Sequence, residues 1–274
     1  MINFIKILNI LITLIITLIL PLVTWYLYSK KHQRVSGPII AGGLAFYLTQ
    51  MVIRIPLITI LASTSFISNL IDKQPFIYSL YLGISAALFE LAGRIIVILL
   101  LKRKMSYQFA FSLGFGHGIC ETVFLVGFIY LNNLIIVLLL NYGNQDLLLG
   151  LLHNTETIEY LKNVFISTDS ITFLLAGIER ILSILFHISM SIILCYGYQK
   201  KKFITSIMIV FILHSFIDTM VTYFSLLGLD IYVIELFVLL TTLMVFVLSN
   251  KLKNKFDKKE IPLSEAEIAI NKGY

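Results

Sequence analysis

The sequence predicts an all-α, polytopic transmembrane helix bundle of about seven or eight helices. Of its 274 residues, 58% are hydrophobic and only 13% are charged, and the mean hydropathy is +0.93. Roughly a quarter of the residues in a soluble domain are charged, so this composition excludes an ordinary soluble fold. The apolar residues also fall into runs of about 20 or more, which is the length that a helix needs to cross a bilayer.

Seven such runs follow one another along the chain. They lie approximately at 5–28, 37–61, 78–101, 106–131, 171–198, 203–227 and 231–249. The first run is too long for a signal peptide and has no small-residue cleavage site, so we expect it to remain as a helix. We therefore expect one transmembrane domain over 1–250 and a short basic cytoplasmic tail over 251–274. In this tail Ser264 and Glu267 have the spacing of a helix capping box.

The segments between the runs carry fewer signals. Residues 141–170 form a long connection with an amphipathic stretch, which predicts either an interfacial helix or a lid over a cavity. Cys120 and Cys195 lie in apolar runs without the spacing of a metal site, so we interpret both as core residues.

The basic residues predict the orientation in the membrane. With Lys272, four clusters in alternate loops hold 15 of the 21 Lys and Arg residues: "KKHQR" (30–34), "KRK" (102–104), "KKK" (200–202) and "KLKNKFDKK" (251–259). By the positive-inside rule the N-terminus lies outside and the C-terminus is cytoplasmic. We interpret these clusters as topology signals in contact with the lipid bilayer and not as a nucleic-acid site.

Ten ionisable residues nevertheless lie inside five of the predicted spans. They are Arg54, Arg94, Arg180, Glu90, Glu121, Glu179, Asp218, His117, His187 and His214. A charged group at the centre of an isolated transmembrane helix costs roughly 2.5–3.5 kcal/mol on insertion scales. These side chains must therefore face one another or a hydrated cavity.

Four of these residues share one depth. Counted from the cytoplasmic end of each span, four lie about 11 or 12 residues in, roughly 16–18 Å and close to the bilayer midplane: Glu90, His117, His187 and His214. Glu121 and Asp218 lie one helical turn further out, at i, i+4 from a histidine. A single buried ion pair often only joins two helices, but this shared depth favours a functional site.

Carboxylates and imidazoles in one cavity suit the hydrolysis of an amide bond. A carboxylate can take a proton from water, while imidazoles orient that water, donate to an oxyanion or ligate a metal. The sequence has neither the HExxH helix of zincins nor a GxSxG motif. "GFGHG" (114–118) lies within a span, so its glycines indicate close helix packing and not a phosphate loop.

Five motifs resemble the YhfC family of predicted intramembrane proteases, which is grouped with the CAAX-protease and PrsW-like superfamily. They are "QMVIRIP" (50–56), "FELAGR" (89–94), "GFGHGICE" (114–121), "ERILSILFH" (179–187) and "HSFID" (214–218). The resemblance extends from about residue 37 to 250. It implies a CAAX-protease-like core and an intramembrane endopeptidase of the bacterial cytoplasmic membrane, glutamic-type or metal-dependent. The implied substrate is a membrane-embedded or lipid-anchored peptide.

The resemblance also implies roles for individual residues. Glu121 or Glu90 activates the water, Asp218 orients His214, and Arg94 fixes Glu90. Three imidazoles bind the oxyanion or, if a metal takes part, the metal: His117, His187 and His214. Whether the protein binds Zn²⁺ or uses no cofactor stays open, because three imidazoles with a carboxylate also suit Zn²⁺.

Two other functions remain open at this stage. Intramembrane Glu, His and Asp residues also form the relays of proton- or ion-coupled transporters, although the sequence has no internal repeat typical of them. A non-catalytic membrane scaffold is the other, because Phe89 occupies the position of the superfamily's first glutamate. The substrate, the pathway and the oligomeric state are not determined by these patterns.

Overall fold

The computed structural model describes four stretches of the chain, residues 1–101, 105–143, 145–152 and 154–256. All regular structure in these stretches is helical, which confirms the predicted all-α class. The basic residues 102–104, Lys272, and the tail residues Ser264 and Glu267 lie outside the described residues.

Seven helical rods in the described stretches are long and apolar enough to cross a membrane, as predicted. They are Phe4–Lys31, Ser36–Ala62, Pro75–Leu101, Tyr107–Tyr142, Ser170–Gln199, Phe203–Leu226 and Ile231–Phe256. Their ends agree with the predicted ends within a few residues except in the seventh, which ends at Phe256 and not near 249, and in the fourth, which continues well beyond the predicted end near residue 131. This extra length packs on the first rod, where Ile136 and Val137 join a core cluster with Ile10 and Leu14.

Three of the rods contain a π-helical segment. The first consists of α1 (Phe4–Leu14), η1 (Ile15–Ile19) and α2 (Leu20–Lys31); the second of α3 (Ser36–Phe46), η2 (Tyr47–Arg54) and α4 (Ile55–Ala62); the fourth of α7 (Tyr107–Glu121), η3 (Thr122–Gly127) and α8 (Phe128–Tyr142). Pro21 and Pro56 closely follow η1 and η2, and proline lacks the N–H that a regular α-helical register needs. Such segments often mark functional sites.

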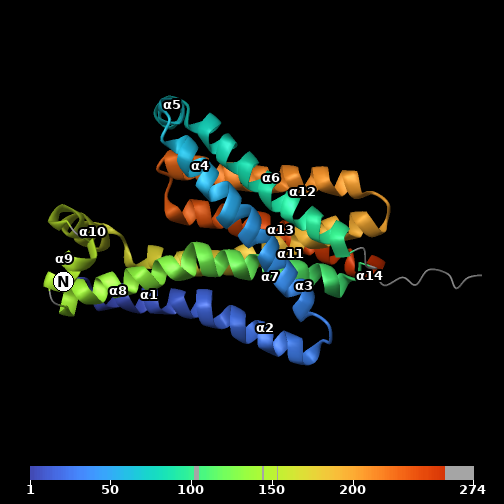
Figure 1. Ribbon diagram of the computed structural model, residues 1–274, viewed down its shortest axis with the longest axis horizontal. Helices are drawn as coiled ribbons and strands as arrows, with labels where there is room; N and C mark the ends of the chain where they lie inside the picture. The colour runs from blue at the N-terminus through green and yellow to red at the C-terminus, as the bar shows by residue number, and fades with distance from the viewer. Residues whose placement is uncertain (102–104, 144, 153, 257–274) are drawn as a thin grey trace, which may run out of the picture.

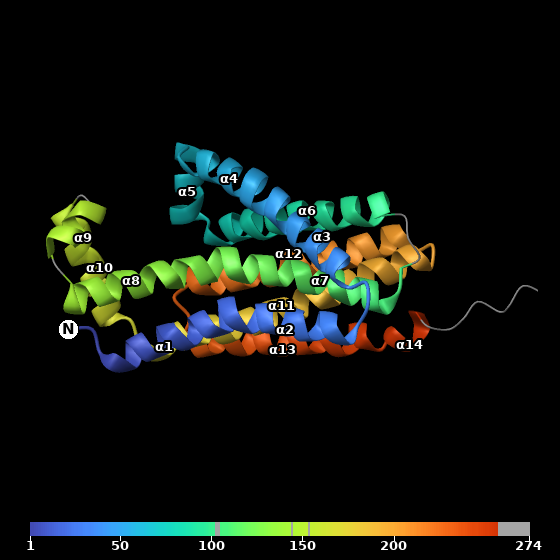
Figure 2. The ribbon, with the colours of Figure 1, turned by 60° about the horizontal axis from the view of Figure 1, so that its bottom comes forward.

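The remaining rods are regular helices. They are α6 (Pro75–Leu101), α11 (Ser170–Gln199), α12 (Phe203–Leu226) and α13 (Ile231–Asn250), the last followed by α14 (Lys253–Phe256). The long helices lie side by side, and the rod formed by α3, η2 and α4 crosses them obliquely before α5 (Ser65–Lys73) turns the chain back into α6 (Figure 1; Figure 2).

The connection 141–170 contains two short helices, α9 (Gln145–Leu152) and α10 (Thr155–Ser167). They lie at the end of the bundle where the N-terminus lies (Figure 1). Lys6 Nζ donates to the carbonyls of Phe165 and Ile166 at 2.9 and 2.6 Å, which attaches α10 to α1. No described residue of α9 or α10 lines the central cavity, so their position favours the predicted interfacial helix over a lid.

The described basic loops gather at the opposite end. The turn between α2 and α3, the turn between α11 and α12, and α14 all lie at the end away from the N-terminus (Figure 1; Figure 2). This grouping agrees with the alternation of basic loops along the sequence. That this end is cytoplasmic stays a prediction from the positive-inside rule.

Glycines bring α3 and α7 into backbone contact. A Cβ on Gly42 would overlap the carbonyl of Leu113, and a Cβ on Gly116 would overlap the carbonyl of Ile39. On the other face of α7, a Cβ on Gly114 would meet the backbone of α11. The glycine motif predicted to allow close packing thus holds α7 between two neighbours.

We expect Gly116→Ala to lower the thermal unfolding temperature in detergent. The added methyl group has no room against the α3 backbone, and overpacking of this kind costs about 1–3 kcal/mol. Gly37→Ala is the matched control, because nothing lies within 4 Å of a Cβ there. Equal unfolding temperatures for the two variants would contradict the close approach of α3 and α7.

Candidate active site

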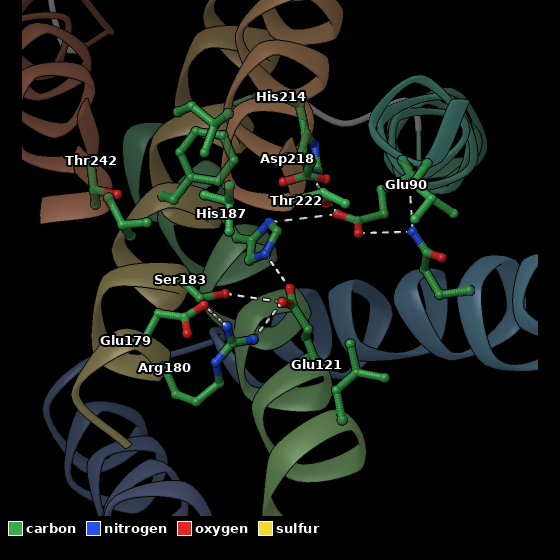
Figure 3. A pocket seen from close by; sticks show the side chains of 18 of the residues that line it. Glu90, Glu121, Glu179, Arg180, Ser183, His187, His214, Asp218, Thr222 and Thr242 are labelled. Carbon is green, nitrogen blue, oxygen red and sulfur yellow. Dashed lines mark hydrogen bonds and ion pairs between the residues drawn. The ribbon is translucent and has the colours of Figure 1, made fainter. Parts of the chain in front are cut away.

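A cavity of about 290 Å³ lies among α6, α7, α11 and α12, with η2 and α13 at its sides. It has room for several water molecules. Its wall carries four carboxylates and two imidazoles, those of Glu90, Glu121, Glu179, Asp218, His187 and His214 (Figure 3). These side chains come from separate parts of the chain, so only the folded bundle brings them together.

Glu90 of α6 is the residue on which the surrounding polar side chains converge. Its Oε2 lies 3.0 Å from His117 Nε2, 3.4 Å from Arg94 Nη2 and 3.5 Å from His214 Nε2. Its other oxygen, Oε1, accepts a hydrogen bond of 2.8 Å from Gln50 Nε2. All of these side chains are buried. One carboxylate thus connects η2, α6, α7 and α12.

His187 of α11 lies between the two glutamates (Figure 3). Arg94 Nη2 lies 2.7 Å from His187 Nδ1, and because a guanidinium can only donate, Nδ1 is the acceptor. In the neutral ring the proton is then on Nε2, the nitrogen that contacts a carboxylate oxygen of Glu121. Arg94 therefore determines which side of the ring faces each carboxylate.

Glu121 ends α7, and residues on one face of α11 hold it. Its Oε1 accepts hydrogen bonds from Arg180 Nη1 at 3.0 Å and from Ser183 Oγ at 3.1 Å. Arg180 also pairs with its neighbour Glu179. Because Arg180, Ser183 and His187 are spaced at i, i+3 and i+7, they share a face of α11 and reach the same carboxylate.

His214 and Asp218 form an i, i+4 pair on α12. Asp218 Oδ2 lies 3.3 Å from His214 Nε2, the same nitrogen that faces Glu90. Because both neighbours are acceptors, Nε2 carries the proton. The Nδ1 atoms of His214 and His117 have no hydrogen-bond partner among the described residues. His214 is thus held through one nitrogen, between the centre of the cluster and the partly exposed Asp218.

The structure brings all seven predicted site residues into one network: Glu90, Arg94, His117, Glu121, His187, His214 and Asp218. Our interpretation of the sequence gave no site role to Gln50 or Ser183. Gln50 precedes Arg54 by four residues in "QMVIRIP", and Ser183 precedes His187 by four residues. Because residues four apart share a helix face, this spacing was the signal that could have added both residues to the predicted site. Phe89 does not line the cavity.

Four of these side chains fit a divalent metal ion. Glu90, His117, Glu121 and His187 each offer one ligand atom, and these atoms lie within 4.8 Å of one another. Carboxylate oxygen and imidazole nitrogen are ligands that Zn²⁺ accepts. His214, the third imidazole predicted as a ligand, is not in this group of four, although it contacts Glu90.

Comparison with known proteins found one matching family and a similar bacterial protein. Residues 14–240 match the family model described as YhfC intramembrane metalloprotease. One similar protein is "Uncharacterized membrane protein YhfC" of Bacillus subtilis (strain 168), which is 21% identical over 182 residues, covering 66% of this chain and 70% of that protein. No solved structure matches the chain.

We expect Arg94→Met to destabilise the bundle strongly. The guanidinium is completely buried and contacts both Glu90 and His187, and removing one partner of a buried pair costs about 3–5 kcal/mol. Lys162→Met is the control, since it breaks an exposed pair with Glu159 that contributes about 0–1 kcal/mol. Thermal unfolding in detergent measures both, and a similar small loss in each would contradict the importance of Arg94.

Proposed function

We propose that this chain, which belongs to the YhfC intramembrane metalloprotease family, hydrolyses a peptide bond of a membrane-embedded or lipid-anchored peptide. One observation carries the proposal. Two carboxylates and two imidazoles from α6, α7 and α11 bring their ligand atoms within 4.8 Å of one another beside a polar cavity, inside a bundle of helices long enough to span a membrane. The location supports the proposed substrate class, because a peptide that reaches this cavity must be at or in the bilayer.

Glu90, His117 and His187 would hold the metal ion. Glu90 suits a ligand because Gln50 donates to its Oε1 and Arg94 to its Oε2, and a ligand held by outer hydrogen bonds keeps its orientation. Arg94 donates to Nδ1 of His187, so His187 would bind the metal through Nε2 and would lose the proton of that nitrogen on doing so. A bound divalent ion supplies Lewis-acid polarisation of the scissile carbonyl.

Glu121 is the proposed general base. Arg180 and Ser183 hold its Oε1, while its Oε2 faces His187 at the cavity wall. Glu121 takes a proton from water as the water oxygen bonds to the scissile carbonyl carbon. It returns that proton to the leaving nitrogen as the C–N bond breaks.

His214 is the proposed donor to the oxyanion. It lines the cavity and carries its proton on Nε2, the nitrogen that faces Glu90 and Asp218. A preorganised donor beside the scissile carbonyl stabilises the charge that develops on its oxygen. Asp218 would keep the imidazole turned toward the cavity.

The two glutamates should differ in their response to substitution. We expect Glu121→Gln to keep the bound metal and lose roughly 100- to 10,000-fold in kcat, the usual contribution of a general base. Glu90→Gln should lose metal and activity together. The assay uses purified protein in phosphatidylethanolamine–phosphatidylglycerol vesicles, a panel of fluorogenic transmembrane peptides, and elemental analysis of the metal.

Glu159→Gln is the control for this experiment, because Glu159 is an exposed glutamate of α10. It should match the wild type in both metal content and cleavage. Full activity in both Glu90→Gln and Glu121→Gln would overturn the assignment. A wild-type protein that binds no metal and cleaves no peptide would contradict the proposed function and favour a scaffold, or a transporter if vesicles show ion flux.

Metal removal should abolish cleavage reversibly. We expect 1,10-phenanthroline to inactivate the wild-type protein in these vesicles and added Zn²⁺ to restore it, because the proposed ligands are one carboxylate and two imidazoles, which suit Zn²⁺. Cleavage that persists in protein shown by elemental analysis to contain no metal would instead indicate a glutamic mechanism.

A further inference from the structure

Gln50 connects the π-helical segment η2 to the proposed metal ligand Glu90. Its side chain is 2% exposed, and its Nε2 donates 2.8 Å to Glu90 Oε1 and 3.3 Å to the carbonyl of Ala86. The shift to π register includes this residue, because the N–H of Ile55 bonds to the carbonyl of Gln50. Gln50 therefore takes part in two features at once: its carbonyl belongs to the π-helical turn, and its side-chain amide bonds to Glu90.

Arg54 fixes the orientation of the Gln50 amide. Arg54 Nη1 donates to Gln50 Oε1 at 3.2 Å, so the amide nitrogen must face Glu90. Two further bonds anchor the guanidinium to α6, from Nε to Ser85 Oγ at 3.1 Å and from Nη2 to the carbonyl of Leu82 at 2.9 Å. Because all five donors of a guanidinium lie in one rigid plane, these bonds leave Arg54 little freedom.

We propose that Gln50 is a positioning residue for Glu90, and that Arg54 holds Gln50 in place. By fixing Oε1, Gln50 sets the rotation of the carboxylate, so that Oε2 points to His117 and His187. The inference rests on the proposed function, in which Glu90 is a metal ligand. Gln50 itself touches no reacting atom in this scheme.

A structural role alone does not account for this arrangement. Asn9 shows what such a role looks like, because its buried side chain donates 2.7 Å to the carbonyl of Ser170 and so attaches α1 to α11. Gln50 makes a comparable bond to a carbonyl, but it also donates to a carboxylate of the cluster. Its far end is fixed by a second side chain. Outer hydrogen-bond partners of this kind orient metal ligands.

The test compares Gln50→Met with Asn9→Leu, two substitutions that replace a buried amide by an apolar side chain of similar size. Purified protein in phosphatidylethanolamine–phosphatidylglycerol vesicles is titrated with Zn²⁺, and the visible absorption of the Co²⁺-loaded protein reports the ligand field. We expect both variants to unfold at a lower temperature. Only Gln50→Met should weaken Zn²⁺ binding, by about 10- to 100-fold, and change the Co²⁺ spectrum.

Kinetics provide a second comparison on any peptide that the wild type cleaves. Gln50→Met should lower kcat with little change in KM, because Gln50 acts through Glu90 in this scheme, whereas Asn9→Leu should change neither. If Gln50→Met does not fold, Gln50→Glu replaces it. A glutamate at this position keeps a partner for Arg54 but, when ionised, offers no N–H to Glu90, so the same loss of Zn²⁺ affinity is expected.

Two results would overturn the inference in different ways. Wild-type Zn²⁺ affinity and an unchanged Co²⁺ spectrum in Gln50→Met and Gln50→Glu would show that Gln50 is only structural, while the proposed function would stand. A wild-type protein without metal binding or cleavage would overturn the proposed function first, and the positioning role with it.

Discussion

The structure depends on the cost of placing a charged group in the bilayer interior without a partner. Each such group costs roughly 2.5–3.5 kcal/mol on an isolated helix, so the acidic and basic side chains must find one another across helices. Glu90 satisfies this constraint with contacts from η2, α6, α7 and α12. The helices that supply these donors cannot separate without leaving a buried charge unpaired, and the position of the cluster therefore restrains the bundle.

Close packing is the condition under which such short side chains can meet. An imidazole extends only a few ångströms from the backbone of its helix, so α7 must lie near its neighbours. Gly114 and Gly116 remove the side chains that would keep α11 and α3 away. The rings of His117 and His187 then lie 4.8 Å apart, centroid to centroid. The same glycines that stabilise the helix contacts thus determine the geometry of the cluster.

Burial differs between the centre of the network and two of its outer carboxylates. Arg94 and His117 are fully buried, whereas the side chains of Asp218 and Glu179 are 34% and 31% exposed. Asp218 follows His214 on α12 and Glu179 precedes His187 on α11, so the exposed side of the network faces the end of the bundle where the N-terminus lies (Figure 1). The partly exposed carboxylates thus lie on that side of the cavity, which suits the proposed entry of a peptide from there.

The sequence by itself determined the all-α class, the seven spans and the common depth of the polar residues. These properties are local, because hydropathy and a rise of 1.5 Å per residue depend only on neighbours along the chain. Which polar side chains contact one another across helices is not a local property. It depends on how each helix is rotated about its axis and on the distance between the helices. Only the tertiary structure therefore placed His187 between Glu90 and Glu121, left His214 outside the group of four, and brought Gln50 of η2 to Glu90. The extension of the fourth rod through α8 was decided in the same way, by its packing on α1.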